Sequence, residues 1–232
     1  MQSVSTLLNW GPSLLSGVLV TITLALVTLP VGLLIGYFVA IAKLSSEPSL
    51  RLAGNVYTTI FRGLPELVTL FLVYFGGQIA IQSIVHLFNA EATVEVNAFV
   101  AGMIALGVVN SSYSSEVFLS AFRAIPRGQY EGGYAVGLSK RQTMRLVVLP
   151  QLIRIALPGL SNLWLILLKD TALISIIGLA DIQRQAGIAS RVTKEPFLFF
   201  GVACLIYLVL AIISSFAING IERKVGTQER HR

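Results

Sequence analysis

Long runs of apolar residues without charge alternate with short polar segments along this chain. The first run, residues 13–42, holds 30 positions without a charged side chain, and about 20 apolar residues are enough for a helix to cross a bilayer. Further runs cover approximately residues 64–85, 98–122, 152–180 and 197–219. The pattern predicts an all-α, polytopic membrane protein with five transmembrane helices in a single domain, residues 1–232. The first helix is longer than the bilayer core is thick, so we expect it to tilt, protrude or bend near Pro30.

The composition supports this class and disfavours several others. Apolar residues make up 55% of the chain and charged residues only 12%, whereas soluble domains carry roughly 25% charged residues. A soluble enzyme, a nucleic-acid-binding protein and a secreted disulfide scaffold are therefore poor candidates. The single cysteine, Cys204, lies inside an apolar run, which excludes an intrachain disulfide.

The basic residues predict the orientation of the spans, because Lys and Arg concentrate on the cytoplasmic side of membrane proteins. Thirteen of the 17 basic residues lie between spans 1 and 2, between spans 3 and 4, or after span 5. The opposite side holds three, Arg184, Arg191 and Lys194. We therefore expect the N-terminus outside and the C-terminus, including Arg230, His231 and Arg232, in the cytoplasm. The first 42 residues contain no Lys or Arg, so the first span is expected to be a retained helix and not a cleaved signal peptide.

The segment 123–151 is the longest hydrophilic stretch and has more order than a simple connection needs. Pro126 and Gly128 are expected to end the third span, and Glu131 to lie near the start of a short new helix, where a carboxylate complements the helix dipole. Gly132, Gly133 and Gly137 leave a bare side for close approach, and Gly137 is suited to reversing the chain. A basic helical stretch, Lys140 to Arg145, then leads back to the membrane. By composition alone, this segment could equally be an amphipathic helix lying on anionic lipid headgroups.

The spacing within this segment resembles the EAA loop of bacterial ABC-importer permeases. The family pattern is E-A-A-x3-G-x9-I-x-L-P, and this chain has Glu131, Gly132, Gly133, then Gly137, and finally Val147-x-Leu149-Pro150. The resemblance implies that the loop forms a cytoplasmic coupling helix that docks into a groove of the ATP-hydrolysing subunit. Both alanines of the pattern are glycines here, and each change costs about 1 kcal/mol of helix propensity.

Other segments extend the resemblance over roughly residues 13–225. "YTTIFRGLPELVTLFLVYFG" (57–76) and "ALPGLSNLWLILLKDTALISIIGL" (156–179) are similar to the second-span and fourth-span signatures of the polar amino acid permeases. "EPFLFF…LIYLVL" (195–210) resembles the Q-type subunits of the histidine/lysine/arginine/ornithine and octopine/nopaline systems. The chain is thus identified as resembling a type I ABC-importer permease of the bacterial inner membrane.

The resemblance also implies partners. They are a homodimer of ATP-binding subunits, a second permease subunit of the M type, a periplasmic solute-binding protein docking on segments 86–97 and 181–196, and the lipid bilayer. ATP and Mg²⁺ are expected on the ATPase, and no cofactor or nucleic acid on this chain. The implied function is ATP-driven import of polar, basic amino acids by alternating access, with opine import as the alternative within the family.

Four charged residues lie within the predicted spans and are candidates for a substrate path, since charge at membrane depth is expensive unless it meets a partner or a cavity. Glu66 could line a cavity beside Pro65, but an ion pair with Arg62 at the cytoplasmic headgroup level is slightly favoured. Glu116, in the polar stretch 110–116, is the better placed anion for a cationic substrate, although a tie to a neighbouring helix fits about as well. Lys169 and Asp170 point about 100° apart on a helix and cannot pair with each other. Asp170 is our first choice for contacting a cationic amino acid, and Lys169 is expected to be structural.

Asn162, Trp164 and Thr171 are weaker candidates for the path, and the serines of span 3 are expected to be helix-contact residues. No catalytic residue or metal ligand is predicted, because the chain has no G-x4-G-K-[ST], H-E-x-x-H or G-x-S-x-G motif and its histidines, His86 and His231, lie outside the spans. An intramembrane enzyme is therefore disfavoured. A secondary transporter driven by an ion gradient is the alternative from another class, although five spans are few for one and no inverted repeat is visible.

Overall fold

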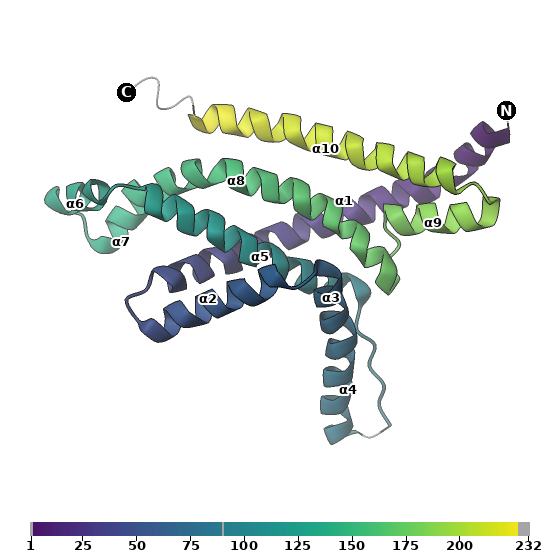
Figure 1. Cartoon of the computed structure of the whole chain (residues 1–232), viewed down its shortest axis with the longest axis horizontal. Helices are drawn as coiled ribbons and strands as arrows, with labels where there is room; N and C mark the ends of the chain where they lie inside the picture. Colours follow the sequence, from purple (N-terminus) through teal and green to yellow (C-terminus); the bar gives the residue numbers. More distant parts are fainter. Residues whose placement is uncertain (1, 90, 227–232) are drawn as a thin grey trace.

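Five helical stretches in the computed structural model, which describes residues 2–89 and 91–226, are long and apolar enough to cross a membrane. They are Thr6–Leu44, Glu66–Phe88, Ala98–Ala124, Lys140–Ile177 and Pro196–Lys224. The described residues contain no strand (Figure 1). The predicted all-α fold with five spans is confirmed, and the first, fourth and fifth stretches extend beyond the predicted apolar runs. The tail residues Arg230, His231 and Arg232 lie outside the described residues.

The two central helices, α1 (Gln2–Leu44) and α5 (Ala98–Ala124), make the most extensive contact in the chain. Helix α1 continues through Pro30 without interruption. Small residues allow the close approach: a Cβ added at Gly36 would lie 2.8 Å from the backbone oxygen of Ser111. Ser111, Ser112, Ser114 and Ser115 are all buried. The expectation that the span 3 serines are helix-contact residues is therefore confirmed.

The second crossing, Glu66–Phe88, is irregular, and a helix that the sequence did not predict precedes it. Helix α2 (Pro48–Gly63) runs back along α1 and α5, and after a break the chain continues as α3 (Glu66–Phe71), a π-helical turn η1 (Leu72–Gly76) and α4 (Gly77–Phe88). Helix α4 projects away from the other helices (Figure 1). The sequence predicts only a connection between spans 1 and 2 here, and the structure shows that this connection is largely helical. The amphipathic spacing of α2 was the missed signal, since Leu52, Val56 and Ile60 are exposed while Gly54 and Thr58 are buried.

Three short elements separate α5 from the next crossing. They are α6 (Arg127–Ala135), α7 (Lys140–Thr143) and a π-helical turn η2 (Met144–Val148). The chain then enters α8 (Leu149–Asp170), which ends in a 3-10 helix, η3 (Thr171–Ile177). Elements α6 and α7 lie together at one end of the molecule, in teal at the left of Figure 1.

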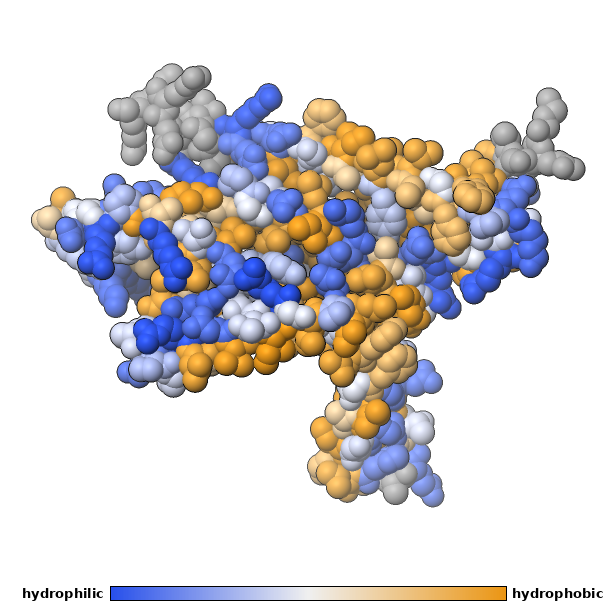
Figure 2. All heavy atoms as spheres, in the orientation of Figure 1, coloured by the Kyte–Doolittle hydropathy of each residue, from blue (hydrophilic) through white to orange (hydrophobic). Residues whose placement is uncertain are grey.

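The segment between spans 4 and 5 is a helix, α9 (Ile182–Thr193), where the sequence led us to expect a loop over 181–196. Its apolar positions Ile182, Ala186 and Ala189 follow helical spacing and are fully buried against α1 and α10 (Pro196–Gly226). The segment is too polar for a hydropathy window to detect, although Asp181 is a recognisable N-cap residue. Figure 2 shows a hydrophobic surface over α10 and hydrophilic residues around α9.

Candidate functional site

Two helix interruptions meet in the interior of the fold. Leu64 and Pro65, between α2 and α3, have extended backbone with ψ of 139° and 135°. Across from them, α8 gives way to η3 after Asp170. Both sides contribute to one buried apolar cluster with α5, through Leu70 of α3 and Ile174 of η3. Irregular backbone within a membrane protein is tolerated where protein buries it or where it lines a cavity, so these breaks are the natural place for a polar path.

The breaks bring together two carboxylates that are 104 positions apart in sequence. Glu66 is the first residue of α3 and Asp170 the last of α8, and the two side chains are close enough to interact electrostatically, as are Asp170 and Lys169. Both carboxylates are half-buried. Two like charges in a partly buried site repel each other, and a cation between them relieves that repulsion. The structure thus places Asp170 at the end of a helix, where α8 gives way to η3.

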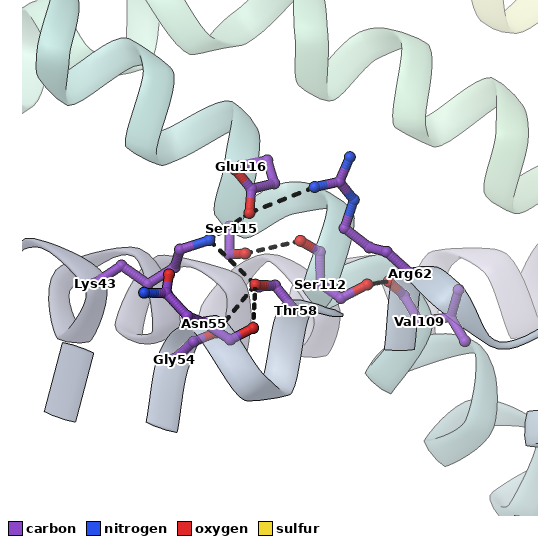
Figure 3. A network of polar contacts seen from close by, with 9 residues as sticks. All are labelled: Lys43, Gly54, Asn55, Thr58, Arg62, Val109, Ser112, Ser115 and Glu116. Atoms are coloured by element: carbon purple, nitrogen blue, oxygen red, sulfur yellow. Dashed lines mark hydrogen bonds and ion pairs between the residues drawn. The ribbon is translucent and has the colours of Figure 1, made fainter. Parts of the chain in front are cut away.

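The ion pair expected between Arg62 and Glu66 was wrong. The Arg62 guanidinium lies 3.5 Å from the carboxylate of Glu116 instead, and Lys43 of α1 also pairs with Glu116 (Figure 3). The Lys43 ammonium further donates to the Thr58 hydroxyl at 3.1 Å. Because Glu116 already pairs with two cations, its position favours the tie between helices over contact with a cationic substrate. Glu66, which we ranked below Glu116 as a contact for a cationic substrate, is the carboxylate that lies near Asp170.

A cavity of about 510 Å³ lies beside this network, between α2 and α5. Sequence reasoning missed most residues that form it because it missed α2. Five of these residues are polar or small and lie on α2, and the sixth is aromatic and lies on α5. They are Asn55, Thr58, Thr59, Arg62, Gly63 and Tyr113. Arg62 stacks over the Tyr113 ring at 5.6 Å from its centroid.

The weaker path candidates are dispersed. Lys169 and Asn162 are exposed, and Trp164 is half-buried. Thr171 is fully buried, and its hydroxyl donates to the backbone oxygen of Leu168 at 2.7 Å, which stabilises the end of α8. Most span 3 serine hydroxyls likewise bond to their own helix, and Ser111 alone among those in the described chain reaches another helix, at 2.6 Å from the Tyr57 hydroxyl.

The predicted coupling segment forms a compact helical turn. Pro126 precedes α6 as expected, but Gly128 lies within α6 and does not break a helix. Glu131 is the fifth of nine residues of α6, not at its start, so it is too far from the N-terminus to complement the helix dipole there. Burial raises the pKa of the neighbouring Tyr130, and Tyr134 adds to the effect.

The three glycines of this segment have different environments. Gly132 is exposed and has open space where a Cβ would lie, whereas a Cβ at Gly133 would lie 2.5 Å from the Thr143 methyl group. Gly133 therefore provides close packing within the chain and not a bare surface. Gly137 has a φ of +84° and reverses the chain, as predicted, and the Leu138 N–H caps α6 by donating to the Gly133 oxygen at 3.0 Å. Leu149 and Pro150 begin α8.

The described residues contain no group of three or more His, Cys, Asp or Glu side chains that could hold a metal ion. Carboxylates occur in the pairs and ion-pair networks above. Carboxylates and cationic side chains of this kind can bind charged groups reversibly.

The family of this chain follows from its sequence. A family model, described as the inner membrane component of binding-protein-dependent transport systems, matches residues 32–227. The chain belongs to this family. It is therefore a multi-pass protein of the inner membrane and a permease subunit of an ABC importer, as the resemblance implied.

Curated relatives cover nearly the whole chain. The nopaline transport system permease protein of Agrobacterium fabrum is 42% identical over 208 residues, which are 89% of this chain and 88% of that protein. The arginine ABC transporter permease protein of Haemophilus influenzae is 40% identical, and the match covers 91% of this chain and 93% of that protein. The histidine/lysine/arginine/ornithine permease protein of Salmonella typhimurium is 38% identical, and the match covers 91% of this chain and 92% of that protein.

A solved structure agrees with this assignment. The crystal structure of an amino acid ABC transporter with histidines matches with a TM-score of 0.80 and 32% identity, over 94% of this chain and 96% of that chain. A methionine ABC transporter in an inward-facing conformation matches with a TM-score of 0.76 at 19% identity, which supports the fold alone. The predicted type I permease fold is confirmed.

Proposed function

We propose that this chain moves polar, basic amino acids of the histidine, arginine, lysine and ornithine class into the cell by alternating access. The observation that carries the proposal is the meeting of Glu66 and Asp170 where two helices are interrupted. A side-chain ammonium or guanidinium fits between these carboxylates, and the helix ends offer free backbone groups to the rest of the amino acid. The relatives named for basic amino acids support this substrate class.

Opines are the second candidate substrate, because relatives of comparable identity are named for nopaline and octopine. An opine carries a guanidinium group like that of arginine and additional carboxylates. Lys169, next to Asp170 and exposed, is suited to such a carboxylate. The ligand that stimulates ATP hydrolysis by the assembled transporter decides between the two classes.

The experiment that tests the path neutralises, one at a time, the two neighbouring charges at the break. We expect Asp170→Asn to lower the rate of arginine uptake into proteoliposomes at least tenfold, because a cation loses one of two carboxylates, whereas Lys169→Gln should change uptake less. The variants are matched because they affect adjacent residues at the same helix end. Uptake kinetics in Asp170→Asn equal to those of the unmodified transporter would remove Asp170 from the path.

The transport cycle that we propose requires partners. Two ATP-binding subunits hold ATP and Mg²⁺, a second permease subunit of the M type completes the path, and a solute-binding protein delivers the substrate from outside. The N-terminus lies on the periplasmic side and the C-terminus in the cytoplasm, which places α6 and α7 inside. Membership in a family of binding-protein-dependent systems supports ATP-driven import over an ion-gradient mechanism.

The proposed contact with the ATPase is the coupling segment, residues 123–151. Its exposed surface includes Glu131, Tyr134 and Val136, the last of which is 75% exposed. An exposed aromatic and an aliphatic side chain at the tip of a short helix suit insertion into a groove. Closure of the ATPase dimer would then move α6, and through the Gly137 turn also α7 and α8, which ends at Asp170.

A further inference from the structure

A cavity of about 340 Å³ lies on the surface of α7 and η2, where the coupling segment leads into α8. Its lining residues are exposed and form two adjacent pairs one helical turn apart, so they share one side of the chain. They are Arg141, Gln142, Arg145 and Leu146, and we call this cavity the α7 groove. The residues that we propose for the ATPase contact, Glu131, Tyr134 and Val136, do not line it. The α7 groove is therefore a surface that the proposed function leaves unexplained.

The polar groups that line the α7 groove are free to donate hydrogen bonds. Arg141 and Arg145 form no ion pair with a carboxylate in residues 2–89 and 91–226. The capping box at the start of α7 orients Gln142, whose Oε1 accepts the Ser139 N–H at 2.9 Å. The NH2 group of Gln142 has no partner in the described chain and remains available. Two guanidinium groups beside an amide suit a ligand that only accepts hydrogen bonds and carries negative charge, such as a phosphate group.

The α7 groove lies at the edge of a membrane crossing. The stretch that is long and apolar enough to form this crossing, Lys140–Ile177, begins at α7, and Leu149 starts α8 only three residues after Leu146. The Leu146 side chain is 62% exposed. An exposed leucine beside two arginines fits the boundary between headgroups and acyl chains, because the leucine reaches the apolar chains while the arginines extend to the phosphates. An anion dissolved in water, in contrast, gains nothing from an exposed leucine.

The α7 groove also faces away from α6, the element proposed to contact the ATPase. Thr143 is the buried residue of α7, and its side chain packs where a Cβ at Gly133 of α6 would lie. By helical spacing, the four lining residues centre on the side of the chain opposite Thr143. A partner that grips α6 is therefore a poor occupant for the groove, whereas a membrane surface beside α7 and η2 meets it directly.

We propose that the α7 groove binds the phosphodiester headgroup of an anionic phospholipid in the cytoplasmic leaflet. The guanidinium groups of Arg141 and Arg145 bind its oxygens, and Leu146 lies against its acyl chains. The negative surface of that leaflet attracts basic side chains next to a membrane crossing. Coupling and lipid binding, which the sequence left as alternatives for residues 123–151, then belong to different elements, α6 for the ATPase and α7 with η2 for lipid. The inference rests on the proposed orientation of the chain and not on the proposed substrate.

The test uses the complete transporter in phosphatidylcholine nanodiscs that contain an increasing fraction of a photoreactive phosphatidylglycerol. The measured quantity is the fraction of this lipid that gives half-maximal crosslinking to the peptide containing Leu146, which mass spectrometry identifies. We expect Arg145→Gln to raise this fraction about threefold and Arg141→Gln/Arg145→Gln about tenfold, because each arginine contributes separately to binding an anionic surface. Arg141→Lys/Arg145→Lys keeps both charges and should raise it less. Arg127→Gln, which removes an exposed charge from α6 outside the groove, is the matched control and should leave it unchanged.

The outcomes distinguish the occupants of the groove. The same half-maximal fraction in every variant, or equal crosslinking of a photoreactive phosphatidylcholine, would overturn the lipid site. Loss of the ATPase subunits from Arg141→Gln/Arg145→Gln without a change in crosslinking would assign the groove to the ATPase and also overturn it. Abolition of the crosslink by millimolar inorganic phosphate would overturn it in favour of a free anion. Crosslinking requires no substrate, so failed arginine uptake by the unmodified transporter would contradict the proposed function alone.

Discussion

At the scale of single residues, the charges of this chain separate into those that bind helices together and those left for other ligands. Lys43 is 7% exposed in its side chain and depends on Glu116 and Thr58 for its partners. Glu66 and Asp170 have each other and Lys169, but no ion pair joins them to an opposite charge within the described chain. The sequence identified Glu66, Glu116, Lys169 and Asp170 as charges within the spans, but it placed Lys43 in the connection between spans 1 and 2. It could not assign their partners, because these lie on other helices, and two of them, Thr58 and Arg62, belong to α2, which the sequence did not predict.

The Lys43–Glu116 pair predicts a measurable coupling. Glu116→Gln should lower the free energy of unfolding by about 1–3 kcal/mol, since it leaves a buried ammonium without its carboxylate. Adding Lys43→Met, which keeps the length of the side chain, should recover part of the loss. Thermal unfolding of the purified transporter gives the four corners of the double-mutant cycle. If the two losses simply add, the pair is not coupled and the network of Figure 3 does not act as a tie.

Asp181 predicts a pH dependence at the outer end of the molecule. Its carboxylate caps α9 by accepting the Arg184 N–H at 2.8 Å, while its other oxygen is buried without a hydrogen-bond partner in the described chain. Burial raises the pKa of Asp181 to about 6, against a smaller opposite effect of the hydrogen bonds from backbone amides. Between pH values of about 4 and 6, the folded state therefore binds more protons than the unfolded state, and stability falls as the pH rises through this window.

The variant Asp181→Asn isolates this effect, because asparagine caps a helix as well as aspartate does but does not titrate. We expect its unfolding temperature to vary less between pH 4.5 and 7 than that of the unmodified protein. Asp181→Ala, which also loses the cap, should be less stable at every pH. An identical pH profile in the unmodified protein and in Asp181→Asn would show that this carboxyl group does not control the dependence.

At the scale of elements, sequence reasoning succeeded for helices with long apolar runs and failed for the amphipathic ones. Helices α2 and α9 have 16 and 12 residues and mix apolar with charged positions, so a search for spans passes over them. The buried and exposed faces of these two helices can be assigned only when the helices against which they pack, α1, α5 and α10, are known. The chain reversal at Gly137, in contrast, was predicted correctly, because glycine is the residue that most readily adopts a positive φ and can therefore be recognised in the sequence.

The coupling turn distinguishes two neighbouring glycines that occupy the alanine positions of the family pattern. Gly132→Ala should stabilise α6 by up to about 1 kcal/mol, because the position is exposed, helical and open. Gly133→Ala should weaken the packing of α6 on α7, because Thr143 would have to move. The measurement is the coupling ratio, amino acid imported per ATP hydrolysed. A fall in that ratio for Gly132→Ala but not for Gly133→Ala would contradict this account of the turn.

At the scale of the whole molecule, hydropathy was enough to predict the five spans in their order along the chain. It was not enough for the broken second crossing, because Pro65 marks a possible break but not which residues gather around it. The meeting of Glu66 with Asp170 depends on how α3 packs on η3 and α5. Contacts between residues so far apart in the sequence result from helix packing, and they cannot be predicted from the pattern of a single sequence.

The proposed orientation predicts a labelling pattern. Cys204 is the only cysteine, so Cys204→Ser gives a background for single introduced cysteines. Val192→Cys on α9 and Val136→Cys beside α6 are matched, since the native side chains are 67% and 75% exposed. In spheroplasts, a membrane-impermeant maleimide should label Val192→Cys alone, and in inside-out vesicles Val136→Cys alone. The reverse pattern would invert the topology.

The close crossing of α1 and α5 limits how the molecule can move during transport. Gly32 and Gly36 bring the α1 backbone against Asn110, Ser111 and Ser114 with no room for sliding. These two helices must therefore move as one rigid body. The change between outward-open and inward-open states then has to be absorbed elsewhere, and the extended residues at 64–65 and the junction after Asp170 are the hinges that the fold provides. The proposed substrate contacts would thus lie on the hinges themselves, where bound ligand and conformation are directly coupled.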